Sequence, residues 1–378
     1  MAYGRKLLQI SRNCARWAPV QKAPTTISPK FLSEFQSFYP KLIDTTIARN
    51  KYLNESIVKD RIKKISEYHP LNKIPVQGEF LLYIYELMEK PENINEKMLH
   101  QAYSVACLIE TIQAYFIIQD DVLDRAKMRC NLPCWHLLPD VNPICITDLN
   151  LLRHFANEIL RQNVDESIYN KLYDVCNEMY LQLEISQQRD YEIQRSRDYS
   201  KFTMDDYNLT QTFKASYYCI TSVVHMALVL SNKATQESFQ LAEDLCTDMG
   251  VVFQLNNDYS DYVDTDGSIS GKSSTDIPLG KCSFFAIAAL KHGNTEQRKI
   301  FEENYGSWDP ECIKRIRKLY NELNLTKLYK EEMQSRYNTY LQKVNALPED
   351  ATPSPDVFLK ILDFYRSYAD DTSRYYYI

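Results

Sequence analysis

The sequence predicts an all-α fold, and three observations support this prediction. The chain has 378 residues but only 8 glycines. This is far below the usual level of about 7%, so the chain offers few positions for tight left-handed turns. It contains no convincing run of strands with alternating apolar and polar residues, and its long segments instead repeat apolar residues at helical spacing.

Helical periodicity appears in seven segments, which are, in order, residues 31–47, 98–119, 149–162, 166–196, 207–231, 234–262 and 310–344. Proline and polar clusters separate them at residues 70–75, 91–95, 133–143, 267–280 and 348–355. No short internal repeat or low-complexity linker is present, so we expect a single helical domain over residues 34–378. The longest apolar stretch, residues 216–230, is shorter than the roughly 20 residues of a membrane span and predicts a buried core helix.

The first 33 residues differ from the rest because they contain six basic residues and no acidic residue. Residues 1–17 can form a basic amphipathic helix, which is typical of a mitochondrial transit peptide. A plain basic tail on a cytoplasmic protein is the alternative. We therefore expect residues 1–33 to lie outside the folded domain, in a mitochondrial or cytoplasmic protein.

Charge and cysteine content exclude several classes of protein. The net charge is −6 and no long basic stripe is present, so nucleic acid is not an expected partner. The ten cysteines are scattered, without the spacing of a zinc site. Free thiols in a reducing compartment are the expectation.

A first acidic cluster follows an apolar helical run. Asp120, Asp121 and Asp124 end the sequence QAYFIIQDDVLD. On one helix Asp120 and Asp124 share a face, since they are four residues apart. Carboxylates at the mouth of an apolar cavity suit Mg²⁺, which binds through one or two carboxylates and the phosphates of a substrate.

A second cluster repeats this arrangement. Asn257, Asp258 and Asp261 follow the apolar start of VVFQLNNDYSD. Two such helices facing each other would clamp several Mg²⁺ ions. Hard cations beside an oily pocket imply a substrate with a polyphosphate head and a hydrocarbon tail.

Basic residues that could hold a diphosphate stand near both clusters. Arg129 follows the first cluster, Lys214 precedes the second, and Lys272 comes after it. Together with Mg²⁺ they would stabilise departing diphosphate and so generate an allylic cation.

Five motifs, in one order, carry a resemblance to a known family. QAYFIIQDDVLD with MRCNLPCWH, EISQQRDY, FKASYY, VVFQLNNDYSD and GKSSTDIPLGKCSFF resemble the farnesyl diphosphate synthases among the trans-isoprenyl diphosphate synthases. The likeness covers roughly residues 35–370. It implies an all-α bundle around a central cavity, a homodimer, and three Mg²⁺ ions that hold an allylic diphosphate for coupling to isopentenyl diphosphate.

The resemblance also assigns residues. It implies metal ligands drawn from Asp120, Asp121, Asp124, Asn257, Asp258 and Asp261. It implies diphosphate donors at Arg129, Lys214 and Lys272, and site positions at Gln254 and Asp190. Tyr115 and Phe116 fall where the family sets the depth of the chain pocket, and two bulky rings there imply C10 or C15 chains. Lys51, Gln113 and Lys281 match further family positions.

The departures from the family pattern all fall at the site for isopentenyl diphosphate, the second substrate. RNKYLNE, residues 49–55, replaces a glycine-rich stretch and has Asn54 where the family has arginine. Cys130 replaces a second arginine, and the chain end is SRYYYI rather than basic. Each lost arginine removes a bidentate phosphate donor.

These departures favour a class I terpene synthase that ionises farnesyl diphosphate to a sesquiterpene, similar to the insect enzymes derived from this family. A farnesyl or geranyl diphosphate synthase that still condenses isopentenyl diphosphate is the first alternative. A non-catalytic regulatory subunit of such a synthase is the second.

Overall fold

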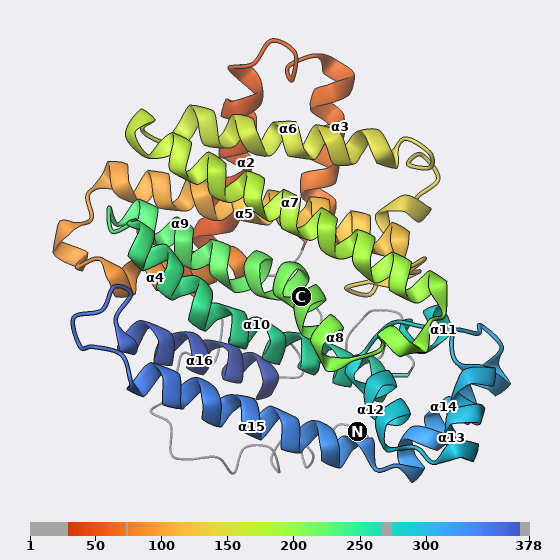
Figure 1. Cartoon of the computed structure of the whole chain (residues 1–378). Coiled ribbons are helices and arrows are strands. Elements are labelled where there is room, and N and C mark those ends of the chain that lie inside the picture. Colours follow the sequence, from red (N-terminus) through yellow and green to blue (C-terminus); the bar gives the residue numbers. More distant parts are fainter. Residues whose placement is uncertain (1–28, 73–74, 266–273, 371–378) are drawn as a thin grey trace.

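The computed structural model describes residues 29–72, 75–265 and 274–370, and in this part of the chain the fold is helical (Figure 1). The α-helices are α2 (Pro29–Ala48), α3 (Ser56–Tyr68), α4 (Val76–Met88), α5 (Glu96–Leu123), α6 (Cys145–Asn163), α7 (Glu166–Ser196), α8 (Met204–Gln211), α9 (Ser222–Leu230), α10 (Gln236–Val263), α11 (Asp276–Leu279), α12 (Phe284–His292), α13 (Thr295–Asn304), α14 (Pro310–Glu322), α15 (Leu325–Asn345) and α16 (Pro355–Asp370). Four further elements are 3₁₀ or π turns: η1 (Pro91–Asn93), η2 (Trp135–Leu137), η3 (Tyr199–Lys201) and the π-helix η4 (Thr212–Thr221). Strands β1 (Met128–Arg129) and β2 (Leu132–Pro133) form an antiparallel hairpin.

The expected all-α fold is confirmed, and the segment at residues 166–196 coincides with α7. The segment at 207–231 is continuous but contains the π-helix η4 between α8 and α9. The segment at 310–344 is two helices, α14 and α15, because Asn324 adopts a left-handed conformation with φ of 50°. Helices α3, α4, α12, α13 and α16 were not expected. Helix α4 escapes detection because it is buried nearly all round and shows no apolar stripe.

Side-chain caps explain where several helices begin. The Asn95 side chain accepts a hydrogen bond from the Met98 amide at the start of α5. Thr235 and Ser238 form a reciprocal capping box at the start of α10. Such caps satisfy amide groups that have no partner within the helix. They fix the starts of the two helices that later carry the acidic clusters.

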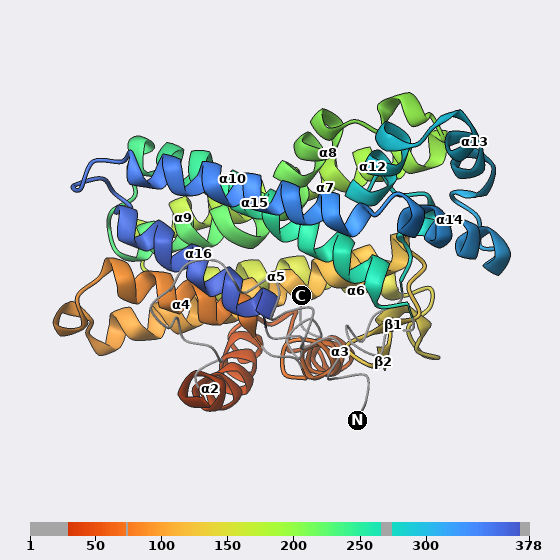
Figure 2. The same cartoon turned by 90° about the horizontal axis from the view of Figure 1, so that it is seen from below.

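The long helices form one packed body. Helices α5, α6, α7, α9 and α10 run across the view of Figure 1 with α15 and α16 beneath them, while α2 and α3 cross this stack steeply. Figure 2 shows α2 and α3 nearly end-on, beside the other helices. Helices α11 to α14 gather at one end of the body. The C-terminal ends of α5 and α7 point to that same end.

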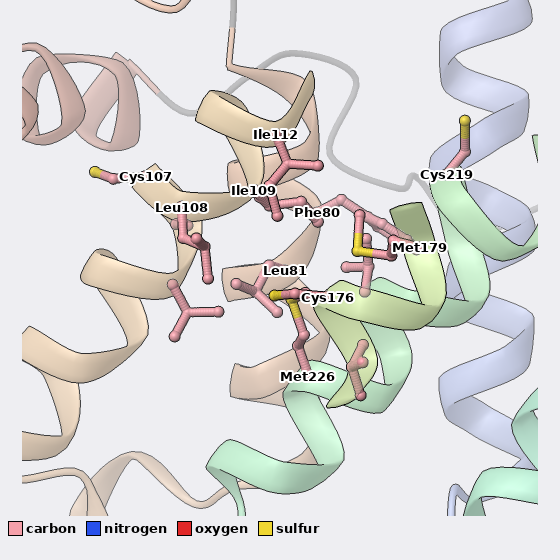
Figure 3. Close-up of a cluster of buried hydrophobic side chains, with 14 of the residues drawn as sticks. Phe80, Leu81, Cys107, Leu108, Ile109, Ile112, Cys176, Met179, Cys219 and Met226 are labelled. Atoms are coloured by element: carbon pink, nitrogen blue, oxygen red, sulfur yellow. The ribbon is translucent and has the colours of Figure 1, made fainter. Parts of the chain in front are cut away.

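The main apolar core lies where α4, α5, α7, η4 and α9 meet (Figure 3). Phe80, Ile109, Met179 and Met226 are fully buried there. Cys176 lies among them, and burial raises the pKa of its thiol to about 12. Every cysteine in the described part of the chain is a free thiol, which agrees with the absence of a disulfide framework in the sequence.

Helices η4 and α10 approach each other unusually closely. A Cβ atom on Gly250 would lie 2.1 Å from the Cα atom of Ser216. The Ser216 hydroxyl donates to the carbonyl of Thr247 across this contact, at 2.9 Å. Only glycine permits this spacing, and the contact fixes the position of η4 against α10.

Two helical stretches in the described part of the chain are long and apolar enough to cross a membrane: Glu96–Leu123 and Met204–Leu230. Their most apolar windows are 89% and 83% buried inside the fold. Both therefore act as core helices in this structure.

Candidate active site

The first acidic cluster lies at the C-terminal end of α5, at the end of the body where α11 is found (Figure 1). Asp120 and Asp124 stand one turn apart, and Asp124 caps the helix. Both carboxylates line one polar cavity together with Asp190 of α7. The helix face predicted from the sequence is therefore present, and α7 adds a third acid to it.

Two lysines lie between these three acids. The Lys214 ammonium lies 3.2 Å from Oδ1 of Asp120 and 3.1 Å from Oδ2 of Asp190. The Lys281 ammonium lies 2.5 Å from Oδ2 of Asp124 and 3.9 Å from Oδ2 of Asp190. The side chains of Asp124, Asp190 and both lysines are 13% to 18% exposed. The result is an alternating cluster of charges that is largely shielded from water.

The pKa shifts in this cluster follow from its burial and charges. Burial raises the pKa of Asp120, but the charges of Lys214, Lys281 and Arg129 outweigh it and hold that pKa far below the ordinary value. Burial keeps the pKa of Asp124 above the ordinary value despite the charge of Lys281. Burial lowers the pKa of Lys214, but the charges of Asp120 and Asp190 raise it by more than burial lowers it. The pKa of Lys214 therefore lies above its ordinary value. Asp120 and Lys214 are thus charged at neutral pH.

Asp121 faces a different partner from its two neighbours. It is fully buried, and its Oδ1 accepts hydrogen bonds from Nε and Nη2 of Arg129 at 3.0 and 2.7 Å. Nη2 of Arg129 also donates to Asp120, at 3.3 Å. Asp121 does not line the cavity, whereas Arg129 does. In this arrangement Asp121 orients Arg129, which is a different role from the metal ligand expected from the sequence.

The second acidic cluster reaches the same cavity from α10. Asn257, Asp258 and Asp261 all line it, together with Gln254. The predicted convergence of the two clusters is therefore present in the geometry. The carboxylates of Asp258 and Asp261, however, already accept hydrogen bonds from other residues of the chain.

Asp258 ties three helices together. It accepts hydrogen bonds from the Tyr207 hydroxyl of α8, the Phe284 amide of α12 and the Gln254 side chain, at 3.0, 2.8 and 2.8 Å. Burial raises its pKa to about 6 against these hydrogen bonds. With its oxygens occupied in this way, Asp258 acts as a structural link beside the cavity.

Asp261 is held by the segment that begins α11. It accepts hydrogen bonds from the Ser274 hydroxyl at 3.0 Å and from the Thr275 amide at 2.8 Å. Arg317 of α14 donates to Ser274 at 3.0 Å and to the carbonyl of Tyr262 at 2.5 Å. Ser274 and Arg317 thereby fix the direction of the Asp261 carboxylate.

The cavity between these groups has a volume of about 60 Å³, which is room for about two water molecules. Its lining is mostly polar and charged: Asp120, Asp124, Ala126, Arg129, Asp190, Gln211, Lys214, Gln254, Asn257, Asp258, Asp261, Thr275, Asp276, Lys281, Cys282 and Ser283. Lys214 and Lys281 point their ammonium groups at carboxylates of this lining.

The donor set fits divalent cations that are held jointly with a substrate. Within residues 29–72, 75–265 and 274–370, no three His, Cys, Asp or Glu side chains are placed to hold a metal ion by themselves. Asp120 and Asp124 each already face a cation, the ammonium group of a lysine. Mg²⁺ needs only one or two such carboxylates, with waters and phosphate oxygens completing its shell. Asp120 and Asp124 are therefore the residues best placed to hold it.

Several residues expected at the site lie elsewhere. Lys51 is exposed in the turn between α2 and α3, with its ammonium 4.8 Å from the centre of the Tyr52 ring. Just before that turn, the carbonyl of Thr46 in α2 accepts a hydrogen bond from Gln162 in the C-terminal part of α6, at 3.2 Å. Lys51 is not a lining residue of this cavity, and its predicted contact with isopentenyl diphosphate stays a prediction. Lys272 falls in residues 266–273, outside the described residues.

Gln113, Tyr115 and Phe116 are buried within α5, before the acidic turn. Phe116 packs edge-on against Tyr180 and Tyr218, with ring centres 5.4 and 4.8 Å apart. The Tyr115 hydroxyl donates to Glu184, at 2.9 Å. None of the three is a lining residue of the cavity, and the role of Tyr115 and Phe116 in setting the depth of a chain pocket stays a prediction.

Sequence reasoning undervalued two residues that the geometry puts at the centre. Lys281 contacts Asp124 directly, although Lys272 was the expected donor. The Gln187 side chain donates to Oδ1 of Asp120, at 3.0 Å. Its signal was the EISQQRDY motif, from which only Asp190 was chosen.

Comparisons with known proteins show the family to which the chain belongs. The sequence profile of the polyprenyl synthetase family matches residues 76–323, and the chain belongs to that family. Farnesyl pyrophosphate synthase 1 of Cannabis sativa is 30% identical over 84% of this chain and 94% of its own. Monoterpene synthase FDS-5, chloroplastic, of Artemisia spiciformis is 29% identical over 86% and 83%, and farnesyl pyrophosphate synthase of the insect Murgantia histrionica is 26% identical over 86% and 80%.

Proposed function

We propose that this chain is a Mg²⁺-dependent enzyme that ionises an allylic prenyl diphosphate at the cavity between α5, α7 and α10. The observation that carries this proposal is the alternation of Asp120, Asp124 and Asp190 with Lys214 and Lys281 around one cavity. A site with this charge pattern binds a polyanion only together with cations. When bound, Mg²⁺ neutralises the diphosphate and stabilises it as a leaving group.

The residues of the chain have separate tasks in this proposal. Asp120 and Asp124, with Asn257 and Asp261, hold the metal ions. Lys214, Lys281 and Arg129 turn from carboxylates toward diphosphate oxygens once substrate enters, since a charged donor aimed at developing negative charge lowers the barrier. Lys272 joins them as a further donor. The buried surroundings keep bulk water from weakening these contacts.

The fate that we propose for the allylic cation is transfer to isopentenyl diphosphate, which makes the enzyme a prenyltransferase. Membership of the polyprenyl synthetase family supports this, as do relatives named farnesyl pyrophosphate synthase in a plant and an insect. The terpene synthase interpretation favoured by the sequence is not confirmed by these comparisons, which fit the alternative better. The buried rings of Tyr115 and Phe116, on α5 just before the first acidic cluster, favour short C10 or C15 products.

A second candidate is a class I terpene synthase, in which the cation rearranges or reacts with water. Cys130 favours it, because the family resemblance places it where the family has a phosphate-binding arginine. The exposed position of Lys51 outside the cavity lining points the same way. A relative is itself named a monoterpene synthase.

Product analysis separates the two candidates. The full chain would be incubated with Mg²⁺ and either farnesyl diphosphate alone or isopentenyl plus dimethylallyl diphosphate, and products identified by gas chromatography with mass detection after phosphatase treatment. Prenyltransfer predicts geraniol or farnesol from the second mixture, and from the first only the farnesol that phosphatase releases from unreacted substrate. A volatile C15 hydrocarbon or alcohol from the first mixture, without phosphatase, would establish the terpene synthase instead. Unchanged substrate in both mixtures would refute the proposed chemistry.

We also propose that the enzyme is a homodimer in mitochondria or cytoplasm. Leu181 and Ile185 of α7 support the first part, since both are exposed, at 55% and 40%, one helical turn apart. Residues 1–28, part of the expected transit segment at 1–33, lie outside the described residues. Light scattering after size-exclusion chromatography tests the dimer, and a fluorescent fusion of residues 1–33 tests the address.

A further inference from the structure

We infer that Gln211 is a further contact for the substrate, and that its side-chain amide donates a hydrogen bond to an oxygen of the bound diphosphate. This inference rests on the proposed function, because it assumes that a diphosphate occupies the cavity. Neither the acidic clusters nor the family motifs single out Gln211.

Helix geometry places Gln211 beside a proposed diphosphate donor. Gln211 is the last residue of α8, and Lys214 follows three residues later in η4. Residues three apart share a helical face, and both side chains line the cavity. The change from α-helix to π-helix falls directly after Gln211, and such changes are frequent at functional sites.

The side-chain oxygen of Gln211 is buried without a hydrogen-bond partner. The side chain is 6% exposed, and its Oε1 accepts no hydrogen bond from any described residue. Two other glutamines near the cavity are committed to carboxylates: Gln254 donates to Asp258 and Gln187 donates to Asp120, at 2.8 and 3.0 Å. Buried amides normally find partners, so the Gln211 amide is available for a ligand.

The chemistry of the cavity indicates which ligand this is. Lys214, Lys281 and Arg129 line the cavity beside six aspartates, so by the proposed function a diphosphate binds there together with Mg²⁺ and draws these three cations toward it. The amide nitrogen carries two donors, and the amide can rotate to exchange its nitrogen and oxygen. With its nitrogen toward a phosphate oxygen, the amide adds a neutral donor to the charged ones.

Calorimetric titration of inorganic diphosphate in excess Mg²⁺ into the full chain tests the inference, with no turnover involved. Gln211→Met keeps the length of the side chain and removes the amide. We expect it to weaken diphosphate binding about tenfold, which is the usual worth of a hydrogen bond to a charged group. Gln240→Met, at an exposed position of α10, is the matched control and should bind like the wild type.

Gln211→Glu distinguishes a phosphate donor from a metal ligand. A carboxylate beside the diphosphate repels it, so we expect Gln211→Glu to bind more weakly than Gln211→Met. If Gln211→Met fails to fold, the affinity of Gln211→Glu for diphosphate tests by itself whether Gln211 contacts the ligand. Wild-type affinity in either folded variant, or tighter binding by Gln211→Glu, would overturn the inference. Failure of the wild type to bind diphosphate would instead count against the proposed function itself.

Discussion

Gly250→Ala tests whether the close contact between η4 and α10 sets the spacing of the site. The new Cβ would lie 2.1, 2.3 and 2.4 Å from Cα, Oγ and Cβ of Ser216, whereas ordinary contact begins at 3.4 Å. The two helices must therefore separate by about 1.3 Å. Lys214 lies half a turn from Ser216 and Gln254 one turn from Gly250, so the separation moves both away from each other.

The expected cost follows from two opposing effects. Overpacking a core of this kind costs about 3 kcal/mol, and replacing a helical glycine by alanine returns about 1 kcal/mol. The net loss in the free energy of unfolding is about 2 kcal/mol, measurable by urea denaturation followed by circular dichroism. Diphosphate binding should weaken in parallel.

Gly78→Ala is the matched control for this prediction. Its Cβ would lie 3.1 Å from the Ala106 carbonyl oxygen, which a shift of a few tenths of an ångström relieves. We expect a change in the free energy of unfolding of less than about 1 kcal/mol. Equal stability of Gly250→Ala and wild type would refute the role given to the helix contact.

Three further predictions concern charge. Asp120→Ala should lower turnover at least about a hundredfold. The melting temperature should change little, because Lys214 keeps Asp190 as a partner. Turnover within twofold of wild type would contradict the assignment of Asp120 as a metal ligand. Cys130→Arg should tighten isopentenyl diphosphate binding about tenfold by calorimetry. Asn54→Arg should not, because Asn54 precedes the start of α3, whereas it is the end of α3 that contacts the hairpin, through the Tyr68 hydroxyl and the Pro133 carbonyl. The reverse order of effects would show that the turn at Asn54 reaches the substrate. Burial lowers the pKa of His225 to about 4, so between pH 6.5 and 4 the imidazole binds a proton in the unfolded chain but not in the folded one. The free energy of unfolding should therefore fall by about 3 kcal/mol as the pH drops from 6.5 to 4. A His225→Phe variant with the same pH dependence would exclude His225 as the cause.

The sequence was most informative where a local pattern determines the structure. The apolar spacing and caps of α5 and α10 fix where these helices lie, and so the acids at their ends could be predicted to meet. Side-chain partners that come from distant segments could not be predicted from the sequence. Tyr207 and the Phe284 amide occupy Asp258 from helices far away in sequence.

The dependence on distant partners also explains why the sequence predicted Lys272, and not Lys281, as a diphosphate donor. Lys272 and Lys281 belong to one connecting segment, and nothing in their spacing tells which of them reaches Asp124. The structure brings Lys281 there because the Tyr305 hydroxyl donates to its carbonyl, at 2.6 Å. The turn at residues 49–55 is similar, since its Asn50 hydrogen-bonds Glu158 of α6, a partner that the composition of the turn does not reveal.

The most direct test of the account is release of inorganic diphosphate from geranyl diphosphate by the purified full chain, with and without Mg²⁺ and with and without isopentenyl diphosphate. The account predicts release that requires Mg²⁺ and is stimulated by isopentenyl diphosphate. Release in Mg²⁺ alone, without stimulation, would support ionisation but direct the cation to the terpene synthase route. No release under any of these conditions, from a chain that still binds Mg²⁺ and diphosphate, would contradict ionisation at this cavity.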